Sequence, residues 1–298
     1  MRAEELQSDP REELRGRSKE TTERVPIADE EGAKGNGFIA WDVAGMTDVG
    51  LRRSSNQDHI LMDAKNGIFL IADGMGGHRA GERASRMACI HVYRFIRNEL
   101  HSSMPAELQP VEPRKRWTRA MRLAAYSANR YIYDYACAQP RFKGMGTTFV
   151  ALLVHDDHAY VAHAGDSRLY RVQAGAITRV TRDHSRLQDL IDQYNLTEEA
   201  ARNHPFRNVI TRSLGNHPDV EIDIMDFDVE QAEMLLLCTD GLCGVLTDGQ
   251  ILHIVESAKG DMSRGCRLLL QAVNRAGAPD NVSILIARPK DKREPAAL

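Results

Sequence analysis

The chain has 298 residues, a formal net charge of -3, 42% apolar residues and 27% charged residues, which is the composition of an ordinary globular protein with one sizeable core. Because the net charge is slightly negative, the composition argues against a nucleic-acid-binding protein. No apolar run approaches the roughly 18 residues that a membrane-spanning helix needs, so we expect no membrane association.

Residues 1–36 are dense in Glu, Asp, Arg and Lys and contain few large apolar residues. They lack the apolar core of a signal peptide, and such a composition favours a disordered charged extension. A docking segment for a partner protein is the alternative. We expect the folded domain to span residues 37–288, with a charged tail at 289–298.

The first strands should come early in this domain. An apolar run from Phe38 to Ala44 predicts a strand that ends at Asp48. After a polar loop, two apolar runs on either side of Asn66-Gly67 predict a β-hairpin. Its second run, residues 68–72, is unbroken and ends on Asp73, which is typical of a buried strand with a carboxylate at the rim of its sheet. The glycines after Asp73 allow close approach of the backbone to whatever the carboxylate holds.

Residues 80–100 and 113–138 show apolar residues at helical spacing and are joined by a Ser/Pro-rich loop, which predicts two long antiparallel helices. The residues expected to give these helices their apolar faces are Met87, Ile90, Tyr93 and Phe95 in the first, and Trp117, Met121, Leu123, Ala124 and Tyr131 in the second.

Short apolar runs between residues 149 and 180 are joined by tight turns, a pattern that predicts an antiparallel meander and not parallel βαβ winding. Residues 181–216 are polar and irregular, with helical stretches at 185–194 and 197–203, and we expect a mobile flap beside the functional site. Strands at 220–227, 234–239 and 282–287 and helices at 247–257 and 262–275 complete the domain, with Thr247 as a helix cap.

Five cysteines, an odd number with no Cys-x-x-Cys pair, lie mostly inside apolar stretches, where a free cysteine packs as a small hydrophobe. They are Cys89, Cys137, Cys238, Cys243 and Cys266. We therefore expect a reducing, cytoplasmic location.

Aspartates recur at strand ends and turns. Asp73 and Asp240 each end an apolar run and precede a glycine, and Asp58, Asp166 and Asp280 lie in turn-like contexts. An isolated Asp-Gly is usually just a turn, but five converging carboxylates would repel one another and would persist only with cations between them. Oxygen ligands without neighbouring His or Cys pairs favour Mn²⁺ or Mg²⁺ over zinc.

Two such ions can activate a water and clamp the oxygens of a phosphoryl group. A phosphate ester also needs a cationic partner, and Arg53, five residues before Asp58, is the candidate because guanidinium binds phosphate in a bidentate manner. Arg52 is the competing choice.

These residues together resemble the metal-dependent protein serine/threonine phosphatases of the bacterial PPM (PP2C-type) family. The resemblance runs from about Asp42 to Arg288 and rests on the order and spacing of these short motifs: Thr47-Asp48-Val49-Gly50 followed by Arg53, Asn56-Gln57-Asp58, Asp73-Gly74-Met75-Gly76-Gly77, Gly146-Thr147-Thr148, Gly165-Asp166-Ser167, Asp183-His184-Ser185, Thr239-Asp240-Gly241 and Asp280-Asn281. It implies an α+β fold, an αββα sandwich of two antiparallel sheets flanked by helix pairs.

The resemblance also implies roles for single residues. Asp73 would bridge two ions and the Gly74 carbonyl would bind the first, while Asp240 and Asp280 would hold the second ion with Asp58 beside them. Asp166 resembles the ligand of a weaker third ion, shared with Asp240, and Arg53 matches the phosphate-binding arginine. Eukaryotic members carry a histidine directly after the Asp-Gly, proposed as the general acid, where this chain has Met75. The resemblance leaves the general acid open, and His78 is read as a polar residue at a helix start.

Other residues could suggest further functions, but we favour a structural explanation for each. The basic run Arg114–Arg119 includes Trp117 and could suggest nucleic-acid binding, but a solvated helix face explains it. His184 has no cysteine or second histidine nearby in sequence and is expected to organise a loop. Thr147 and Thr148 lack a paired base and are expected to start a strand.

The resemblance implies a protein phosphatase of bacterial signalling that dephosphorylates phosphoserine and phosphothreonine by metal-activated water, acting as a monomer on phosphorylated proteins. A eukaryotic-like Ser/Thr kinase and its targets are the implied partners. The alternative is a catalytically silent PPM-fold binding protein, which the presence of all five aspartates disfavours.

Overall fold

The computed structural model describes residues 41–77, 79–102, 112–194, 204–206, 208–229 and 233–290. The predicted N-terminal extension, His78, the helix predicted at 197–203 and nearly all of the C-terminal tail lie outside these ranges. Within them, no helix combines the length and the apolar character that crossing a membrane requires.

Two antiparallel sheets form the centre of the molecule. The strands of the first sheet follow one another in space as β1 (Trp41–Asp48), β11 (Val282–Pro289), β10 (Met234–Cys238), β7 (Arg168–Gln173) and β8 (Ala176–Arg179). The second sheet has the order β2 (Asp58–Asp63), β3 (Ile68–Met75), β5 (Phe149–His155), β6 (His158–Ala164) and β9 (Asp223–Asp228), and the short β4 (Gly146–Thr147) pairs with the end of β3.

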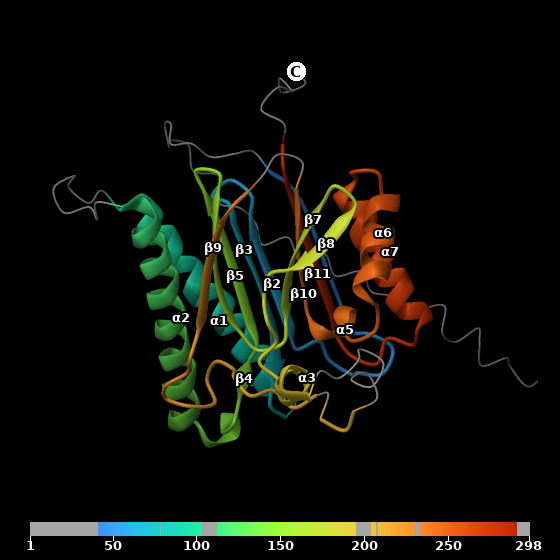
Figure 1. Ribbon diagram of the computed structural model, residues 1–298. Helices are drawn as coiled ribbons and strands as arrows, with labels where there is room; N and C mark the ends of the chain where they lie inside the picture. Colours follow the sequence, from blue (N-terminus) through green and yellow to red (C-terminus); the bar gives the residue numbers. More distant parts are fainter. Residues whose placement is uncertain are drawn as a thin grey trace, which may run out of the picture.

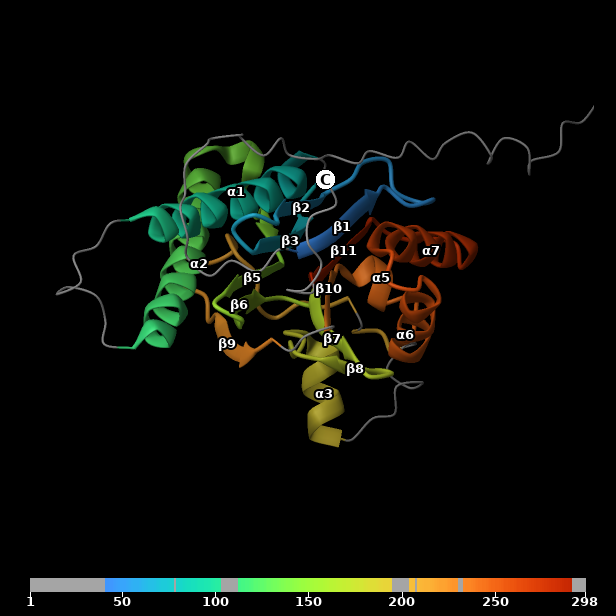
Figure 2. The same cartoon turned by 90° about the horizontal axis from the view of Figure 1, so that it is seen from above.

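Helices cover the outer face of each sheet, as Figures 1 and 2 show. The second sheet is covered by α1 (Arg79–His101) and α2 (Pro113–Ala138), which is followed by the 3-10 turn η3 (Pro140–Phe142). The first sheet is covered by α6 (Asp248–Ser257) and α7 (Met262–Arg275). The short α3 (Arg186–Tyr194) and α5 (Asp240–Cys243) lie with β4 toward one end of the sandwich. The predicted α+β architecture, an αββα sandwich, is confirmed.

Strand β3 shows why the sequence produces three layers of core. Side chains alternate across a strand, so Ile68, Leu70 and Ala72 pack toward α1 and α2, whereas Phe69 and Ile71 pack between the two sheets. Because both faces of β3 are buried, its sequence is apolar at every position from 68 to 72 instead of alternating with polar residues.

The boundaries of the predicted elements are largely confirmed. The hairpin joins β2 to β3, with Gly67 at a positive φ of 65°. Helix α6 begins at the predicted cap: Thr247 Oγ1 accepts a hydrogen bond from the Gln250 amide at 3.1 Å, and the Gln250 side chain accepts one from the Thr247 amide at 2.8 Å. This reciprocal capping box fixes the start of the helix.

The predicted buried faces of the first two helices are partly wrong. Leu123 and Tyr131 are 46% and 50% exposed. On α1 the predicted Met87, Tyr93 and Phe95 are partly buried against the core, while the fully buried face has residues four apart, namely Ala84, Ala88, Val92 and Ile96. Small alanine side chains let the helix axes approach closely, so large apolar residues alone did not reveal the packed face.

Helix α1 meets β3 through two glycines. A Cβ on Gly81 would lie 2.6 Å from the Gly74 carbonyl oxygen, and a Cβ on Gly74 would lie 2.0 Å from the Gly81 carbonyl oxygen. No side chain fits between these backbones, so the pair fixes the start of α1 against the segment that carries Asp73.

We predict that Gly81→Ala destabilises the protein by about 1–3 kcal/mol, because the new methyl group forces two backbones apart. Gly249→Ala in α6 is the matched control: its Cβ would meet no atom within 4 Å, so better helix propensity should stabilise the protein by up to about 1 kcal/mol. Urea unfolding of both variants measures the difference, and equal stabilities would contradict the close packing at Gly81.

Candidate functional site

Five aspartates come together from both sheets. Asp58 begins β2 and pairs directly with Asp73 near the end of β3. From the other sheet, Asp240 follows β10 as the first residue of α5, and Asp280 precedes β11 by two positions. Asp166 lies in the turn between β6 and β7. The strand ends predicted to converge therefore do so, at the end of the sandwich where α5 lies (Figure 1).

The electrostatics show that the carboxylates act on one another. Burial raises the pKa of Asp73 well above its ordinary value, and repulsion from Asp58, Asp240, Asp166 and Asp280 raises it further. Asp73 thus lies at the centre of the cluster and interacts with all four of its other members. Folding a protein around so many like charges is unfavourable unless protons or cations neutralise them.

The pKa values of Asp58 and Asp240 are raised as well. Burial raises the pKa of Asp58 to about 7, helped by repulsion from Asp240 and Asp280 and opposed by hydrogen bonds from Ser283 and Thr239. Burial and repulsion from Asp280 raise the pKa of Asp240 to about 6. A cation bound among these carboxylates would offset the repulsion that raises both pKa values.

Three carboxylate oxygens of the cluster are buried and accept no hydrogen bond from the described residues: Oδ1 of Asp58, Oδ1 of Asp166 and Oδ1 of Asp240. Buried polar atoms are almost always paired, and buried carboxylate oxygens that lack donors are ligands of the kind that hard cations such as Mn²⁺ or Mg²⁺ prefer. The residues present fit these ions.

Arg53 lies over the same group. Its Nη2 donates to Asp280 Oδ2 at 2.7 Å, and the pKa of its guanidinium is raised first by this hydrogen bond and also by the charges of Asp73 and Asp240. The Arg53 side chain is 54% exposed, so solvent and a substrate can reach it. Arg52 is exposed and makes no hydrogen bond or ion pair with the part of the chain that is described, so the geometry favours Arg53 of the two candidates.

The loop that carries Arg53 and Asp58 is tied to the first sheet by Asn281. The Asn281 side chain accepts a hydrogen bond from the Gln57 amide at 2.8 Å and donates to the carbonyls of Val49 and Ser55, both at 2.9 Å. The sequence pattern includes Asp280-Asn281, but it did not reveal that Asn281 is the residue that joins this loop to the start of β11.

Two threonines hold the backbone of Asp73. Thr148 Oγ1 accepts from the Asp73 amide at 3.0 Å and contacts Ser167 Oγ at 2.7 Å. Thr147 Oγ1 donates to the Asp73 carbonyl at 2.8 Å. Both threonines are fully buried. They begin a strand segment as predicted, but they also fix the central carboxylate, a role that sequence reasoning missed.

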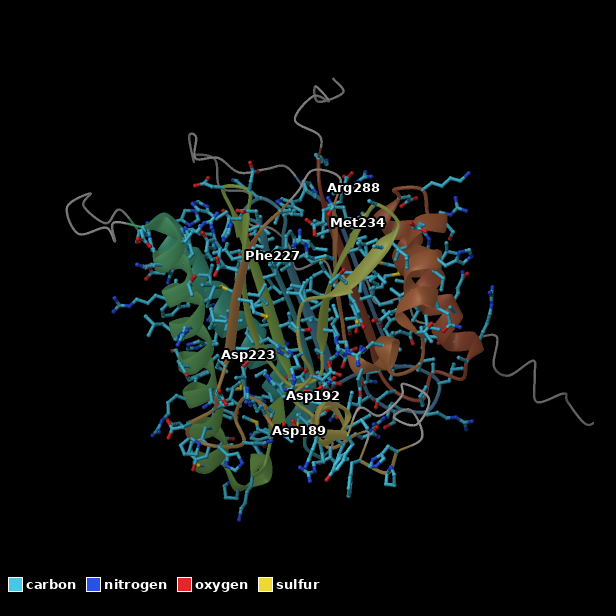
Figure 3. The ribbon with its side chains drawn as sticks, in the orientation of Figure 1. Asp189, Asp192, Asp223, Phe227, Met234 and Arg288 are labelled. Carbon is cyan, nitrogen blue, oxygen red and sulfur yellow. The ribbon has the colours of Figure 1, made fainter. Side chains whose placement is uncertain are left out.

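The segment predicted as a flap is anchored by hydrogen bonds near both of its ends. Arg168 donates to both oxygens of Asp183 at 2.7–3.2 Å, and the amide of Leu214 donates to the Thr147 carbonyl at 2.9 Å. Helix α3 lies within this segment. Its residues Asp189 and Asp192, labelled in Figure 3, both pair with Arg182. Whether this segment moves stays a prediction.

His184 has a histidine neighbour in space, although none is close to it in sequence. The rings of His163 and His184 lie 4.7 Å apart between centroids, and among the described residues only His163, His184 and Asp223 place three potential metal-ligand atoms within 4.8 Å of one another. The ring nitrogens of His184 are already bonded, Nδ1 to the Gly165 amide and Nε2 to Asp223 and to the Arg212 guanidinium. A cation at Arg212 disfavours a metal there, and the group fits the predicted role in organising the loop.

The profile of the family described as protein phosphatase 2C matches residues 52–274. The chain belongs to the protein phosphatase 2C family. Its two-sheet sandwich is thus that of a PP2C domain.

Among its PP2C relatives, a putative protein phosphatase 2C-type protein of Streptococcus pyogenes is 36% identical over 244 residues, which cover 80% of this chain and 94% of that protein. The serine/threonine protein phosphatase PstP of Mycobacterium tuberculosis is 32% identical, and the match covers 82% of this chain but only 44% of PstP.

Solved structures of bacterial phosphatases are similar to this chain in fold. The crystal structure of Mycobacterium tuberculosis PstP superposes with a TM-score of 0.74 at 29% identity, covering 84% of this chain and 99% of that one. A second structure, of the PstP catalytic domain, is a complex with two manganese ions and has a TM-score of 0.72.

The raised pKa values predict how the stability of the metal-free protein depends on pH. Asp58 and Asp240 bind protons more tightly when folded, at about 7 and about 6, than in the unfolded chain near 4. Their contribution to stability is therefore greatest at low pH and is lost as pH rises from about 4 to about 7.

In chelator, the unfolding midpoint of Asp58→Asn should accordingly exceed that of the unsubstituted protein at pH 7.5, while the two proteins should converge toward pH 4.5. Thermal unfolding monitored by circular dichroism measures this difference. An Asn variant that is less stable at pH 7.5 and shows no convergence would contradict the repulsion described for this cluster.

We also predict that Thr148→Val weakens the site. The substitution keeps the shape of the side chain but leaves the Asp73 amide and Ser167 Oγ without a buried partner, which should cost about 1–3 kcal/mol of stability and about 10–100-fold in metal affinity. Thr118→Val on α2 is the matched control: Thr118 is half-buried, its hydroxyl donates within the helix to the Arg114 carbonyl at 2.8 Å, and the change should alter both quantities little. Titration with Mn²⁺ followed by calorimetry checks the affinity, and a Thr148→Val protein with unchanged affinity would rule out this positioning role.

Proposed function

We propose that this chain is a metal-dependent protein serine/threonine phosphatase. The observation that carries the proposal is the cluster of five mutually repelling aspartates, with buried unpartnered oxygens, beneath an arginine in a PP2C fold. Hydrolysis of phosphoserine and phosphothreonine is the chemistry that such a site performs best. The names of the bacterial relatives, which are serine/threonine phosphatases, support the same assignment.

The ions should be Mn²⁺ or Mg²⁺, as the two manganese ions of the PstP catalytic domain suggest. We propose that Asp73, at the centre of the cluster, serves two ions together with the Gly74 carbonyl, Asp58, Asp240 and Asp280. Asp166 would add a third position shared with Asp240. The unpartnered Oδ1 atoms of Asp58, Asp166 and Asp240 support these assignments.

When bound, such ions supply a nucleophilic water near neutral pH and offset the charge of the phosphoryl oxygens. The chain itself must orient the ester. Arg53 is half exposed and lies beside Asp280, so its guanidinium can turn from that carboxylate to two phosphate oxygens. Thr147, Thr148 and Asn281 hold the backbone on which the carboxylates stand, which keeps the acceptor oxygens in place during turnover.

Phosphorylated proteins are the proposed substrates, and a Ser/Thr kinase with its targets remains the proposed source of them. We further propose that the catalytic unit is residues 37–288, that residues 1–36 are not part of it, and that the protein acts as a cytoplasmic monomer. The five cysteines support a reducing location because all are free and three of them, Cys89, Cys238 and Cys266, are buried in apolar surroundings.

The proposal is tested by hydrolysis of a small aryl phosphate and of a phosphothreonine peptide with Mn²⁺, with Mg²⁺ and with chelator. We expect turnover only with metal, and we expect Asp73→Asn and Asp240→Asn to lower kcat by at least about 100-fold, because each removes a ligand charge from the ion pair. Asp134→Asn is the matched control, since Asp134 is exposed on α2 and, among the described residues, pairs with Arg130 alone.

A folded protein that binds Mn²⁺ but turns over neither substrate would instead establish the catalytically silent alternative. Full activity in both cluster variants would remove the aspartates from the mechanism.

A further inference from the structure

The helix pair α1–α2 carries a charge opposite to that of the whole chain. Helix α1 contains five basic and two acidic residues, and α2 contains six basic and one acidic residue, so the pair has a formal charge of +8. The complete chain has a net charge of -3, and the remainder of the protein is therefore -11. Positive charge is concentrated on one outer layer of the sandwich.

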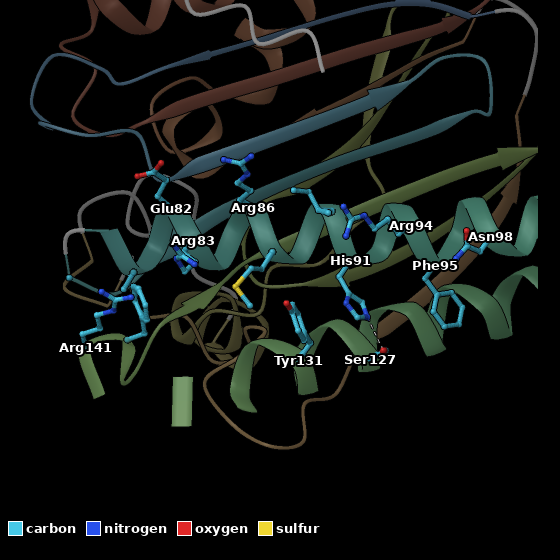
Figure 4. A pocket seen from close by; sticks show the side chains of 15 residues that line it. Glu82, Arg83, Arg86, His91, Arg94, Phe95, Asn98, Ser127, Tyr131 and Arg141 are labelled. Carbon is cyan, nitrogen blue, oxygen red and sulfur yellow. Dashed lines mark hydrogen bonds between the residues drawn. The ribbon is translucent and has the colours of Figure 1, made fainter. Parts of the chain in front are cut away.

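A groove with a volume of about 1350 Å³ runs between these two helices (Figure 4). Four arginines line it, Arg83, Arg86, Arg94 and Arg141, against one acidic residue, Glu82. Neither Arg86 nor Arg94 makes a hydrogen bond or an ion pair with the described part of the chain, and both are exposed. These two guanidinium groups are therefore available to an anionic partner.

The groove also has an apolar lining. Met87, Ile90, Phe95 and Tyr131, four residues of the predicted apolar helix faces, line it, and Met87 and Phe95 also pack against the core beneath. Tyr131 stacks on His91 with 5.1 Å between ring centroids and remains 50% exposed. A mixture of arginines with exposed aromatic and aliphatic side chains is typical of a protein-binding surface, because it provides contact area together with charge.

The position of the groove connects it to the catalytic end. Its first lining residue, Gly77, is four positions beyond Asp73, and its last on α1 is Asn98. At 1.5 Å per residue, the α1 stretch from Ala80 to Asn98 is about 27 Å long, which an extended peptide of about eight residues covers. A chain whose phosphorylated residue lies at the aspartate cluster can thus run directly into the groove.

We propose that this groove binds an acidic segment, about eight residues long, that flanks the phosphorylated residue of the protein substrate. Charge complementarity favours this occupant: acidic side chains would pair with Arg86 and Arg94, and interspersed apolar side chains would contact Met87, Ile90 and Tyr131. A nucleic acid fits less well, since a long polyanion would extend beyond the groove onto a protein surface whose net charge is negative. The proposal rests on the proposed phosphatase function and assigns its substrate preference.

The test compares phosphothreonine peptides that carry, on either side, eight flanking residues rich in Asp, Glu and Leu with peptides of equal length in which Ser and Gln replace the acids. The full chain with Mn²⁺ should show a kcat/KM about tenfold higher for one of the acidic peptides, mainly through a lower KM, and added salt should reduce the preference.

Arg86→Glu/Arg94→Glu should abolish this preference and leave hydrolysis of a small aryl phosphate unchanged. Arg264→Glu/Arg267→Glu, which reverses two exposed arginines on α7 in the opposite layer, is the matched control and should retain it. If the double glutamate variant fails to fold, Arg86→Gln/Arg94→Gln tests the same surface with a smaller change.

Equal kcat/KM values for acidic and neutral peptides, or a preference that survives both Arg86/Arg94 variants, would overturn the proposal while leaving the phosphatase function intact. A protein inactive on every ester would reject that function instead.

Two other occupants of the groove can be distinguished from the substrate segment by experiment. An RNA oligonucleotide that binds more tightly than the acidic peptide and loses binding in Arg86→Glu/Arg94→Glu would assign the groove to nucleic acid. If neutralising Glu4, Glu5, Asp9, Glu12 and Glu13 strengthens acidic-peptide binding, the occupant is the chain's own N-terminal segment.

Discussion

The repulsion centred on Asp73 is the constraint on which the rest of the structure depends. Four other carboxylates act on it, and they reach it from two different sheets. Their separation is therefore set by how the sheets pack, through inter-sheet residues such as Phe69, Leu237 and Leu285. A rigid apolar layer holds these charges together against their repulsion, and this enforced proximity is what gives the site its affinity for cations.

Local sequence signals predicted the elements well because several of them agree at each boundary. Thr247 and Gln250 predict a helix start because their side chains can cap it, and the unbroken apolar run at 68–72 predicts a strand buried on both faces. Five aspartates could be selected because each follows a strand end or a turn. What failed depends on contacts between distant residues: His163 against His184, Thr148 against Asp73, and the alanine face of α1, which large apolar residues at helical spacing obscured.

The molecule separates its charges. The aspartate cluster is acidic and the α1–α2 layer is basic, and the two adjoin where β3 passes through Gly77 into α1. A phosphorylated protein is repelled by the bare cluster and attracted by the helices, so the field of the metal-free protein already distinguishes one direction of approach. Two of the eleven basic residues of this layer, Arg86 and Arg94, make no hydrogen bond or ion pair among the described residues, so their charges are available for recognition.

The division of the cluster between two sheets also bears on how long the protein survives in a cell. Asp58 and Asp73 belong to one sheet and Asp240 and Asp280 to the other, so ions held among them would fasten the sheets together. Anything that binds only the folded state lowers the fraction unfolded in proportion to its free concentration, and proteases act mainly on that fraction. The cell's supply of manganese or magnesium would then set the abundance of this protein as well as its activity, so that starvation for metal would deplete the enzyme itself.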